Sequence, residues 1–357
     1  MICKDFWIDK KVLVTGHTGF KGAWLTLWLQ QLGANLFGIS NESFGSNSMY
    51  ELCNISGNLK NGKLNISDRG DITRHDEICE VIKKINPHVI FHLAAQPLVL
   101  KSYQSPQDTY LANVLGTLNV LEAARDCTDL RVVISVTTDK VYENTELTKV
   151  AFREEHPLGG YDPYSASKAC ADILSQSHYN VFLKKNGVEL ATVRAGNVIG
   201  GGDWAANRLV PDLIRSAIKN EKLVLRYPNA VRPWQYVLDP IRGYIILAQY
   251  LANSANIEDT RFNFGPTLDV QITVLELVKQ LCNEINLPFS CEIKSAYSHH
   301  EANYLNLNSE KAQKLLGWES ILTSHLAISH TANWYKCWME GRDVHEISIK
   351  SIEKMTI

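Results

Sequence analysis

The sequence has no Cys-x-x-Cys pair, although eight cysteines are scattered over its 357 residues. We therefore expect reduced cysteines that act as small hydrophobic side chains, rather than a disulfide framework or a metal site. No apolar run is long enough to cross a membrane, since stretches such as 244–251 are about half a span. The first residues also lack the apolar core of a signal peptide. These absences predict a protein of the reducing cytoplasm, without a metal and without a membrane partner.

The chain also lacks a strong charge of either sign. The formal net charge is −2, so no general basic field would attract nucleic acid. Hydrophobic residues make up 45% and charged residues 21%, which is ordinary for a globular protein. A chain of this length can form two domains, or one large domain with a lobe.

What is present begins with a strand that leads into a glycine-rich turn. Lys11–Thr15 is typical of a short buried strand, and residues 23–32 are typical of an apolar helix. The turn between them has the spacing G-x-x-G-x-x-G, which differs from the usual G-x-G-x-x-G. Three glycines can simply form a turn, but the flanking strand and helix favour a pyrophosphate site at the helix N-terminus. The cofactor residues predicted here are Gly16, His17, Thr18, Gly19, Phe20, Lys21 and Gly22.

The next strand, over residues 35–40, lacks the terminal acid that usually bonds the adenosine ribose of NAD. Ser40 and Asn41 could bond the ribose instead, or Glu42 could reach it. No arginine follows at once to favour a 2′-phosphate. The pattern favours NAD over NADP, with Ser40 in the site.

Two further segments could contact the cofactor. Asp71 could accept a hydrogen bond from the adenine amino group, or it could cap a helix predicted over residues 74–85. A strand over 88–93 ends in small residues that would let the backbone pack against the cofactor, and we expect His92 in it to be a core histidine. The other residues assigned to the cofactor are Ile72, Leu93, Ala94, Ala95, Gln96, Asn113 and Thr137.

The polar segment 136–140 follows a run of β-formers over residues 131–136. It places Thr138, Asp139 and Lys140 at the carboxyl end of a strand, which is the edge where ligands bind in open parallel sheets. We predict that these three residues belong to an active site.

Tyr164 and Lys168 lie four residues apart, so they share one face of a helix predicted from Tyr164 to about Leu183. A nearby ammonium favours the phenolate and lowers the pKa of the tyrosine, which suits a base that removes a proton from a sugar hydroxyl. Y-x-x-x-K is common by chance, but here it follows a complete nucleotide-binding half.

The second half contains a glycine-rich loop over residues 195–204, which includes Asn197 and is typical of a backbone close to a ligand. Guanidinium groups suit phosphate, so we expect one or two arginines of this half to bind a diphosphate, and Arg215 to lie on the surface. The elements predicted around the loop are strands at 188–194, 232–237 and 261–265, and helices at 209–218, 239–251, 273–285, 311–318 and 324–339. No element is assigned beyond Arg342.

Several motifs together resemble the extended short-chain dehydrogenase/reductase family over nearly the whole chain. They are T-G-x-x-G-F-x-G at 15–22, L-A-A at 93–95 and Y-x-x-x-K at 164–168. Within the family, the stretches 91–99, 137–140, 162–165 and 194–204 look most like the CDP-glucose 4,6-dehydratases.

The resemblance implies an α/β fold with a Rossmann-like doubly wound parallel sheet and a smaller α/β lobe. The NAD-binding domain would span 1–193 plus 234–253, the nucleotide-sugar-binding domain 194–233 plus 254–340, and a tail 341–357. The family also implies a homodimer or a dimer of dimers, formed through the helices at 108–125 and 164–183. The implied substrate is a nucleotide sugar in a pathway that supplies deoxysugars to a surface polysaccharide.

The implied chemistry is an internal redox cycle on the sugar of CDP-glucose. C4′ is oxidised, water leaves across C5′–C6′, and the hydride returns to C6′. By resemblance, Thr138 orients the sugar, Asp139 protonates the departing 6′-oxygen, and Lys168 tunes Tyr164. The residues assigned to the substrate are Gln96, Thr138, Asn197, Arg208, Arg232 and Asn263.

Two departures from related dTDP-glucose dehydratases matter. Those enzymes carry Glu where this chain has Lys140, which can be the C5′ base only if neutral and otherwise stabilises an enolate. Their late arginines are matched here by residues 299–304, which read H-H-E-A-N-Y. The alternatives left open are a nucleotide-sugar 4-epimerase, which needs no acid such as Asp139, and a non-enzymatic NAD-sensing protein, which has no use for the Thr138, Tyr164 and Lys168 set.

Overall fold

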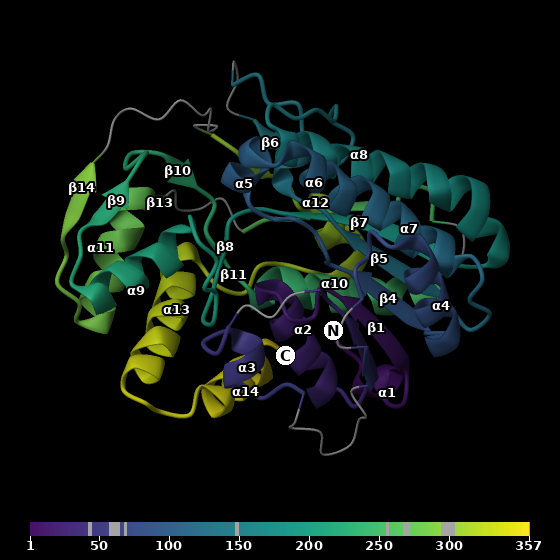
Figure 1. The fold of residues 1–357 in the computed structure, drawn as a ribbon, viewed down its shortest axis with the longest axis horizontal. Helices are drawn as coiled ribbons and strands as arrows, with labels where there is room; N and C mark the ends of the chain where they lie inside the picture. Colours follow the sequence, from purple (N-terminus) through teal and green to yellow (C-terminus); the bar gives the residue numbers. More distant parts are fainter. Residues whose placement is uncertain are drawn as a thin grey trace.

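The computed structural model describes residues 1–41, 45–56, 65–67, 70–146, 150–254, 257–266, 272–293 and 304–356. Within them, a parallel sheet covered by helices on both faces carries a smaller lobe at one side (Figure 1). The predicted fold class is therefore confirmed. Glu42 and residues 299–303, which entered the predictions above, lie outside the described residues. The predicted domain boundaries stay a prediction.

The central sheet has seven strands in the order β12-β7-β5-β4-β1-β2-β3, and every neighbouring pair is parallel. Its strands are β1 (Lys11–Thr15), β2 (Asn35–Ile39), β3 (Asn65–Ser67), β4 (Val89–His92), β5 (Val132–Val136), β7 (Glu189–Ala195) and β12 (Arg261–Phe264). The chain runs outward from β1 to β3 and then crosses back to β4 on the other side of β1. This reversal between β1 and β4 opens a crevice at the carboxyl ends of the strands, where ligands bind in such sheets.

Both faces of the sheet are buried, so its strands are almost continuously apolar. Val12 and Val14 point into one hydrophobic cluster, and Leu13 between them points into the other. Helices α2 (Phe20–Gln31) and α10 (Leu238–Asn253) cover the first face, and α4 (His75–Ile85), α7 (Gly116–Ala124) and α8 (Pro163–His178) cover the second (Figure 1). The helix predicted at 108–125 consists of α6 (Pro106–Tyr110), the π-helical turn η1 (Leu111–Leu115) and α7 in succession. α8 continues through η3 (Tyr179–Leu183) and η4 (Lys184–Asn186).

The smaller lobe lies at the left of Figure 1 and is built from helices and pairs of short strands. Its helices are α9 (Leu209–Lys219), α11 (Val274–Ile285) and α13 (Ser324–Met339). The strand pairs are β8 (Val198–Ile199) with β11 (Gln235–Tyr236), β9 (Leu223–Leu225) with β14 (Cys291–Ile293), and β10 (Val231–Arg232) with β13 (Ile272–Thr273). The other short elements are α1 (Lys4–Trp7), α3 (Met49–Leu52), α5 (Val99–Gln104), α12 (Glu310–Leu316), η2 (Asp139–Val141), and β6 (Ala151–Phe152) paired with β15 (Asn306–Leu307).

The prediction of one strand over residues 232–237 is wrong. Pro233 interrupts it, because proline has no N–H to donate to a ladder. The chain on one side of Pro233 is β10, which pairs with β13, and on the other side it is β11, which pairs with β8.

All eight cysteines lie in the described part of the chain and are free, as predicted. None of the described helices is long and apolar enough to cross a membrane.

The tail contains a helix that the sequence analysis did not assign. α14 (Val344–Met355) begins after Asp343, whose side chain accepts hydrogen bonds from the backbone N–H groups of His345 and Glu346. Its Ser348 accepts a hydrogen bond of 3.0 Å from Trp334 Nε1 on α13. Val344, Ile352 and Met355 are buried in the first hydrophobic cluster. The tail is therefore part of the core beneath α13 and α3.

Removing residues 344–357 is expected to lower the melting temperature by at least about 5 °C, because three buried side chains worth roughly 1.5–3 kcal/mol each are lost. Scanning calorimetry measures the shift. Lys350→Ala is the control on the same helix, since the Lys350 side chain is 62% exposed and should change the melting temperature by less than about 1 °C. An unchanged melting temperature in the truncated protein would show that α14 contributes nothing to the core.

Candidate active site

A cavity of about 840 Å³ lies at the carboxyl ends of the sheet strands and extends towards the smaller lobe. All but three of the predicted site residues line it. The predicted residues that line the cavity are Gly16, Thr18, Gly19, Phe20, Lys21, Gly22, Ser40, Asp71, Ile72, Leu93, Ala94, Ala95, Gln96, Thr137, Thr138, Asp139, Lys140, Tyr164, Lys168, Asn197, Arg208 and Arg232. The structure thus brings together residues that are far apart in the sequence.

The glycine turn forms one wall of the cavity. Gly16 has φ = +74°, which favours glycine, and a Cβ there would lie 2.7 Å from the backbone nitrogen of Ala94. A Cβ on Gly22 would lie 2.0 Å from the Gly16 carbonyl oxygen, so the helix packs directly on the turn. α2 begins at Phe20 with Gly19 as its N-cap and with no side chain capping it. The N–H groups and positive dipole of a helix start of this kind fit a diphosphate.

The end of β2 lies beside this turn. The hydroxyl oxygens of Ser40 and Thr18 are 2.6 Å apart, and Ser40 and Asn41 both line the cavity. Asp71 also lines the cavity, and its Oδ1 accepts hydrogen bonds from the N–H and hydroxyl of Thr73. Asp71 does not cap α4, whose N-cap is Arg74. Of the two roles predicted for Asp71, its position is compatible with the contact to the adenine amino group and not with the helix cap.

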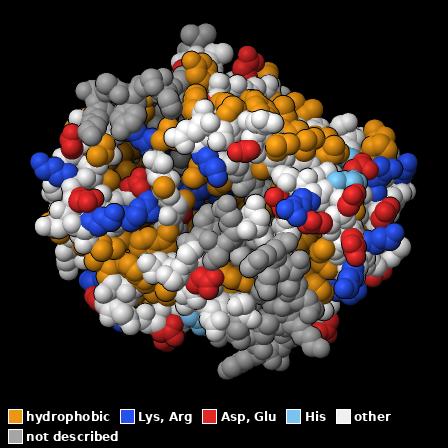
Figure 2. Space-filling model, viewed as in Figure 1, with side chains coloured by type: hydrophobic (Ala, Val, Ile, Leu, Met, Phe, Trp, Pro, Cys, Tyr) orange, Lys and Arg blue, Asp and Glu red, His pale blue; other side chains and the backbone are white. Residues whose placement is uncertain are grey.

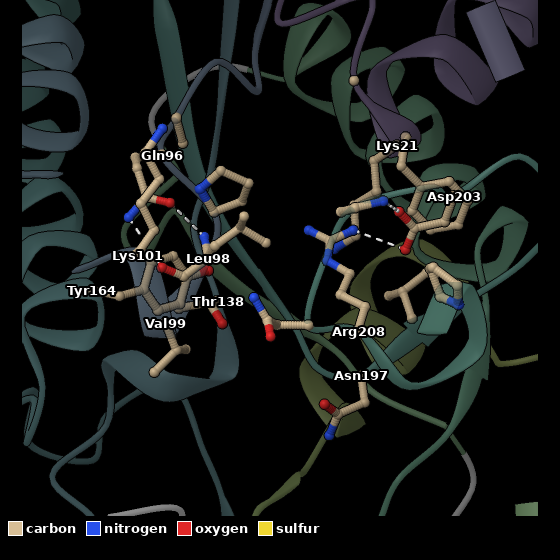
Figure 3. A pocket seen from close by; sticks show the side chains of 18 of the residues that line it. Lys21, Gln96, Leu98, Val99, Lys101, Thr138, Tyr164, Asn197, Asp203 and Arg208 are labelled. Atoms are coloured by element: carbon tan, nitrogen blue, oxygen red, sulfur yellow. Dashed lines mark hydrogen bonds and ion pairs between the residues drawn. The ribbon is translucent and has the colours of Figure 1, made fainter. Parts of the chain in front are cut away.

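Thr138, Asp139 and Tyr164 meet at the carboxyl end of β5. The Thr138 hydroxyl donates a hydrogen bond of 3.0 Å to Asp139 Oδ1. Tyr164 lies in the first turn of α8, which begins at Pro163 with Asp162 as a side-chain N-cap, and so it faces the same cavity. In Figure 3, Tyr164 and Thr138 lie on one side of the cavity, opposite Lys21 and Arg208.

The prediction that the Lys168 ammonium lowers the pKa of Tyr164 is wrong for this structure. Burial raises the pKa of Tyr164 to about 12, against the smaller lowering effect of a hydrogen bond with Thr138. Lys168 Nζ donates a hydrogen bond of 3.0 Å to the carbonyl oxygen of Val136. Burial, and then the charge of Lys21, lower the pKa of Lys168 to about 8. Sequence spacing places the two residues on one face, but only the depth of the cavity decides which influence on the pKa is larger.

Asp139 is the one carboxylate among the predicted catalytic residues, and it is 3% exposed. Its Oδ2 accepts no hydrogen bond from the described part of the chain. Burial raises the pKa of Asp139, and the charge of Lys140 partly offsets this effect. A raised pKa favours the protonated carboxyl group, which can deliver its proton to a leaving oxygen.

Gly196 leaves room for the Asp139 carboxylate, because a Cβ at position 196 would lie 2.8 Å from Asp139 Oδ2. Gly196→Ala should displace the carboxylate and lower kcat by about 10–100-fold. It should also lower the melting temperature, and this loss should largely disappear in an Asp139→Ala background. Equal losses of melting temperature in both backgrounds would mean that Gly196 does not act through Asp139.

The smaller lobe contributes Asn197, Arg208 and Arg232 to the cavity. Arg208 Nη1 donates a hydrogen bond of 3.0 Å to Asp203 Oδ2, which holds the guanidinium at the cavity wall (Figure 3). Asn197 Nδ2 is buried and has no hydrogen-bond acceptor within the described residues. Asp203 is fixed in turn by Tyr335, whose hydroxyl donates a hydrogen bond of 2.6 Å to the Asp203 carbonyl oxygen. Two guanidinium groups and an unpaired amide fit a diphosphate.

Three predicted site residues do not line the cavity. His17 is buried beneath Gly38, where a Cβ would lie 2.5 Å from the imidazole ring. Asn113 lies behind Gln96 and bonds both backbone groups of that residue. Asn263 lies in the core on β12 and bonds the Tyr142 hydroxyl. These positions do not support the ligand contacts predicted for the three residues. All three residues lie behind the residues that line the cavity.

The hydrogen bonds of Gln96 and His92 bear on the roles predicted for these two residues. Gln96 lines the cavity, but its amide bonds the backbone of Leu98 and the hydroxyl of Thr109. His92 is a core histidine, as predicted, because its two ring nitrogens lie 2.7 Å and 3.0 Å from the hydroxyls of Thr15 and Thr117.

Several residues that line the cavity were not predicted from the sequence. Asp203 belongs to the glycine-rich loop already interpreted as close to a ligand, so that loop was the signal for it. Lys101, Tyr161 and Tyr227 also line the cavity, and no motif or periodicity distinguishes them in the sequence.

The parallel sheet, the glycine turn and the Tyr164–Lys168 pair at one cavity define a Rossmann-fold protein of the dehydrogenase type. Residues 13–330 match the model of a family described as GDP-mannose 4,6 dehydratase. The chain is 39% identical to the CDP-glucose 4,6-dehydratase of Salmonella typhimurium, over 96% of this chain and 95% of that protein. The chain belongs to this dehydratase family, within the extended short-chain dehydrogenases/reductases.

Solved structures agree on the fold. An epimerase from Methanothermobacter thermautotrophicus has a TM-score of 0.80 at 23% identity, covering 94% of this chain and 95% of that one. A dTDP-glucose 4,6-dehydratase from Bacillus anthracis, solved with NAD, has a TM-score of 0.75 at 24% identity, covering 93% and 98%.

Proposed function

We propose that this protein converts CDP-glucose into CDP-4-keto-6-deoxyglucose and water. The similarity to the Salmonella typhimurium CDP-glucose 4,6-dehydratase supports the substrate and the reaction. The observation that carries the chemistry is the buried Asp139 carboxyl group, whose Oδ2 is unpaired within the described residues and whose Oδ1 is bonded to Thr138 beside Tyr164. Such an acid is needed to expel a hydroxyl group as water.

The proposed cofactor is NAD, and its fit rests on the glycine turn. The close contacts at Gly16 and Gly22 and the uncapped start of α2 support a diphosphate at this wall. Ser40 and Asp71 would contact the adenosine half, and Lys168 the other ribose. When bound, NAD⁺ accepts the hydride from C4′ of the sugar and later returns it to C6′.

Tyr164 is the proposed base for the 4′-hydroxyl. Its phenolate takes the hydroxyl proton, and Thr138 holds the sugar oxygen in place. The raised pKa of Tyr164 opposes ionisation, and the hydrogen bond with Thr138 favours it. Lys168 adds a positive charge one helical turn away. The 4′-hydroxyl proton therefore passes to Tyr164 only in the fraction of the protein in which the tyrosine is ionised.

Asp139 is the proposed acid for the elimination. Loss of the C5′ proton to a base forms the C5′–C6′ double bond, while the proton of Asp139 passes to the 6′-oxygen, which leaves as water. Lys140 borders the same part of the cavity, and its backbone N–H donates to Thr138 Oγ1 at 3.4 Å. It is the proposed group at C5′, either as the base or as a charge that stabilises the enolate.

The two roles of Lys140 give different pH dependences for Lys140→Glu. If Lys140 is the C5′ base, replacing its amine with a carboxylate changes the shape of the pH–kcat profile, because a different group then accepts the C5′ proton. We expect such a change, and the measurement is kcat from pH 5 to 10 for both proteins, by way of ordinary steady-state assays. A profile of unchanged shape and lower height would assign Lys140 to enolate stabilisation.

Arg208, Arg232 and Asn197 are the proposed contacts of the nucleotide diphosphate. All three residues line the cavity, and Arg208 lies across it from Tyr164 (Figure 3). This supports the assignment, because the sugar must then lie between the diphosphate and the catalytic segment.

We also propose that the chain forms a homodimer through α7, α8 and their neighbours. Figure 2 shows hydrophobic side chains gathered over α5, α6 and α8. On the predicted dimer helices, Leu111 and Leu115 of η1, Ile173 of α8 and Val181 of η3 are exposed by 37%, 47%, 57% and 55%. Exposed apolar groups of this kind mark contact surfaces.

Leu115→Glu combined with Ile173→Glu is therefore expected to convert a dimer into a monomer of about 40.2 kDa in light scattering. Ile218→Glu is the control, since Ile218 is 52% exposed on α9, away from this surface. A wild-type protein that already has the monomer mass contradicts the proposal.

A further inference from the structure

A buried ion pair lies directly behind the catalytic residues. Asp172 follows Lys168 by one turn of α8 and Tyr164 by two, so all three share one helix face. Arg194 is on β7, and both members of the pair are fully buried. The guanidinium donates two parallel hydrogen bonds of 2.9 Å, from Nε to Asp172 Oδ2 and from Nη2 to Asp172 Oδ1. The pair joins the catalytic helix to the centre of the sheet.

The remaining hydrogen-bonding capacity of the pair is also used. Thr137 Oγ1 donates to Asp172 Oδ2 at 3.1 Å, and Thr192 Oγ1 donates to Asp172 Oδ1 at 3.2 Å. Arg194 Nη1 donates to the Tyr142 hydroxyl at 2.7 Å. Arg194 Nη1 also donates to the Glu154 carbonyl oxygen at 3.2 Å. A fully bonded carboxylate and a guanidinium with four hydrogen bonds hold one geometry rather than several.

These bonds connect to both ends of the catalytic segment. Thr137 directly precedes Thr138, and Tyr142 directly follows η2, which contains Asp139 and Lys140. The Tyr142 hydroxyl donates onward to Asn263 Oδ1 at 2.7 Å, which ties this end to β12. The segment 138–141 is therefore anchored at each end to the same ion pair.

Stability alone accounts poorly for this arrangement. Removing two charges from water costs free energy, and apolar replacements of buried ion pairs are often neutral or stabilising. A geometric role accounts for it better, because small displacements of catalytic groups are costly in rate.

We propose that Asp172 and Arg194 are positioning residues that fix the segment 138–141 against the Tyr164–Lys168 face of α8. This inference rests on the proposed function. The pair touches neither the cavity nor a reacting group, so it acts only through the residues it holds.

Asp172 also acts on Lys168 by its charge. The charged and titratable groups that face Lys168 in the described chain are Lys21 on α2, His92 on β4, and Tyr164 and Asp172 on α8. Burial and Lys21 lower the pKa of Lys168, and Asp172 opposes them. Removing the negative charge of Asp172 should therefore move the alkaline limb of the pH–kcat profile to lower pH.

Two matched threonine variants separate positioning from general stability. Thr137→Val and Thr192→Val each remove one hydroxyl bond to Asp172. Only Thr137 adjoins the catalytic segment. Although Thr137 lines the cavity, its hydroxyl is directed to Asp172 and to the Val193 carbonyl oxygen. Thr137→Val is expected to lower kcat about 10-fold with little change in KM, and Thr192→Val to leave kcat within about two-fold, while both lower the melting temperature similarly. Equal effects on kcat would overturn the proposal.

Asp172→Asn is the test of the charge, with kcat measured across pH. The alkaline limb is expected to move to lower pH by about one unit, and an unmoved limb would overturn the electrostatic part of the proposal. If Asp172→Asn does not fold, the threonine pair still decides the positioning role.

The substrate assay on the wild-type protein separates failure of the inference from failure of the proposed function. If wild type does not convert CDP-glucose, the proposed function fails. The inference is then judged from NAD⁺ titrations by tryptophan fluorescence. Thr137→Val should raise the dissociation constant about three-fold or more, because Lys168 bonds the carbonyl of neighbouring Val136, and Thr192→Val should not. Equal dissociation constants would contradict it.

Discussion

Tyr164→Phe is expected to lower kcat for CDP-glucose by about 10²–10⁴-fold and to leave NAD⁺ binding nearly unchanged. Phenylalanine keeps the ring, which is 8% exposed against the cavity, and removes only the group that takes the 4′-hydroxyl proton. The loss should appear in kcat rather than in KM, because the hydroxyl acts in the transition state. Steady-state kinetics with CDP-glucose and fluorescence titration with NAD⁺ measure the two effects.

The control for this variant is Tyr179→Phe. Tyr179 lies in η3, just beyond the end of α8, and its hydroxyl bonds Glu189 away from the cavity. It should retain wild-type kcat. Near-wild-type activity of Tyr164→Phe would remove the tyrosine from the chemistry.

Asp139→Asn should lower formation of the 4-keto-6-deoxy product by about 10²–10⁴-fold, since an amide cannot protonate the departing 6′-oxygen. Oxidation at C4′ does not need this acid. The near-ultraviolet absorbance of reduced nicotinamide should therefore rise when CDP-glucose is added to the variant, and product should not follow. Asp259→Asn is the matched control, because Asp259 pairs with Arg261 and Lys311 and does not line the cavity. If Asp139→Asn forms product at the wild-type rate, another group is the acid.

Asp139 and Asp259 should also give the stability of the protein opposite dependences on pH. Burial raises the folded-state pKa of Asp139, so its contribution is fully present below the unfolded pKa and is lost as pH rises through the folded pKa. Asp139→Asn should thus gain melting temperature relative to wild type as pH rises from about 4 to 8.

Asp259 has the reverse linkage. Although burial opposes it, hydrogen bonds from Arg261 and Lys311 lower the pKa of Asp259 to about 2. Its contribution is present above the unfolded pKa and is lost as pH falls through the folded pKa. Asp259→Asn should therefore be less stable than wild type at neutral pH and approach it in acid. Parallel pH trends for the two variants would contradict these assignments.

Local pattern was enough to predict most of the fold and the site. Lys11–Thr15 and the glycine turn form a single strand–turn–helix unit whose function depends on short-range geometry. Thr138, Asp139 and Tyr164 converge because parallel strands end at one edge of the sheet and α8 returns to that edge.

What failed depends on contacts between distant residues. Asn263 carries a polar amide on a strand next to the site. Only the packed structure shows that the amide oxygen accepts a hydrogen bond from the Tyr142 hydroxyl. The pKa of Tyr164 depends on how deeply α8 is buried, which spacing does not encode. α14 packs on Trp334 and the core beneath it, and these contacts join residues that no local pattern connects.

The most direct test of the account is the product formed from CDP-glucose labelled with deuterium at C4′. We expect CDP-4-keto-6-deoxyglucose, detected by the absorbance of the alkali-treated product, with the deuterium at C6′. CDP-galactose in its place would mean a 4-epimerase, and recovery of unchanged CDP-glucose would leave a protein that only binds NAD. Either result would contradict the assignment of Asp139 as the acid of an elimination.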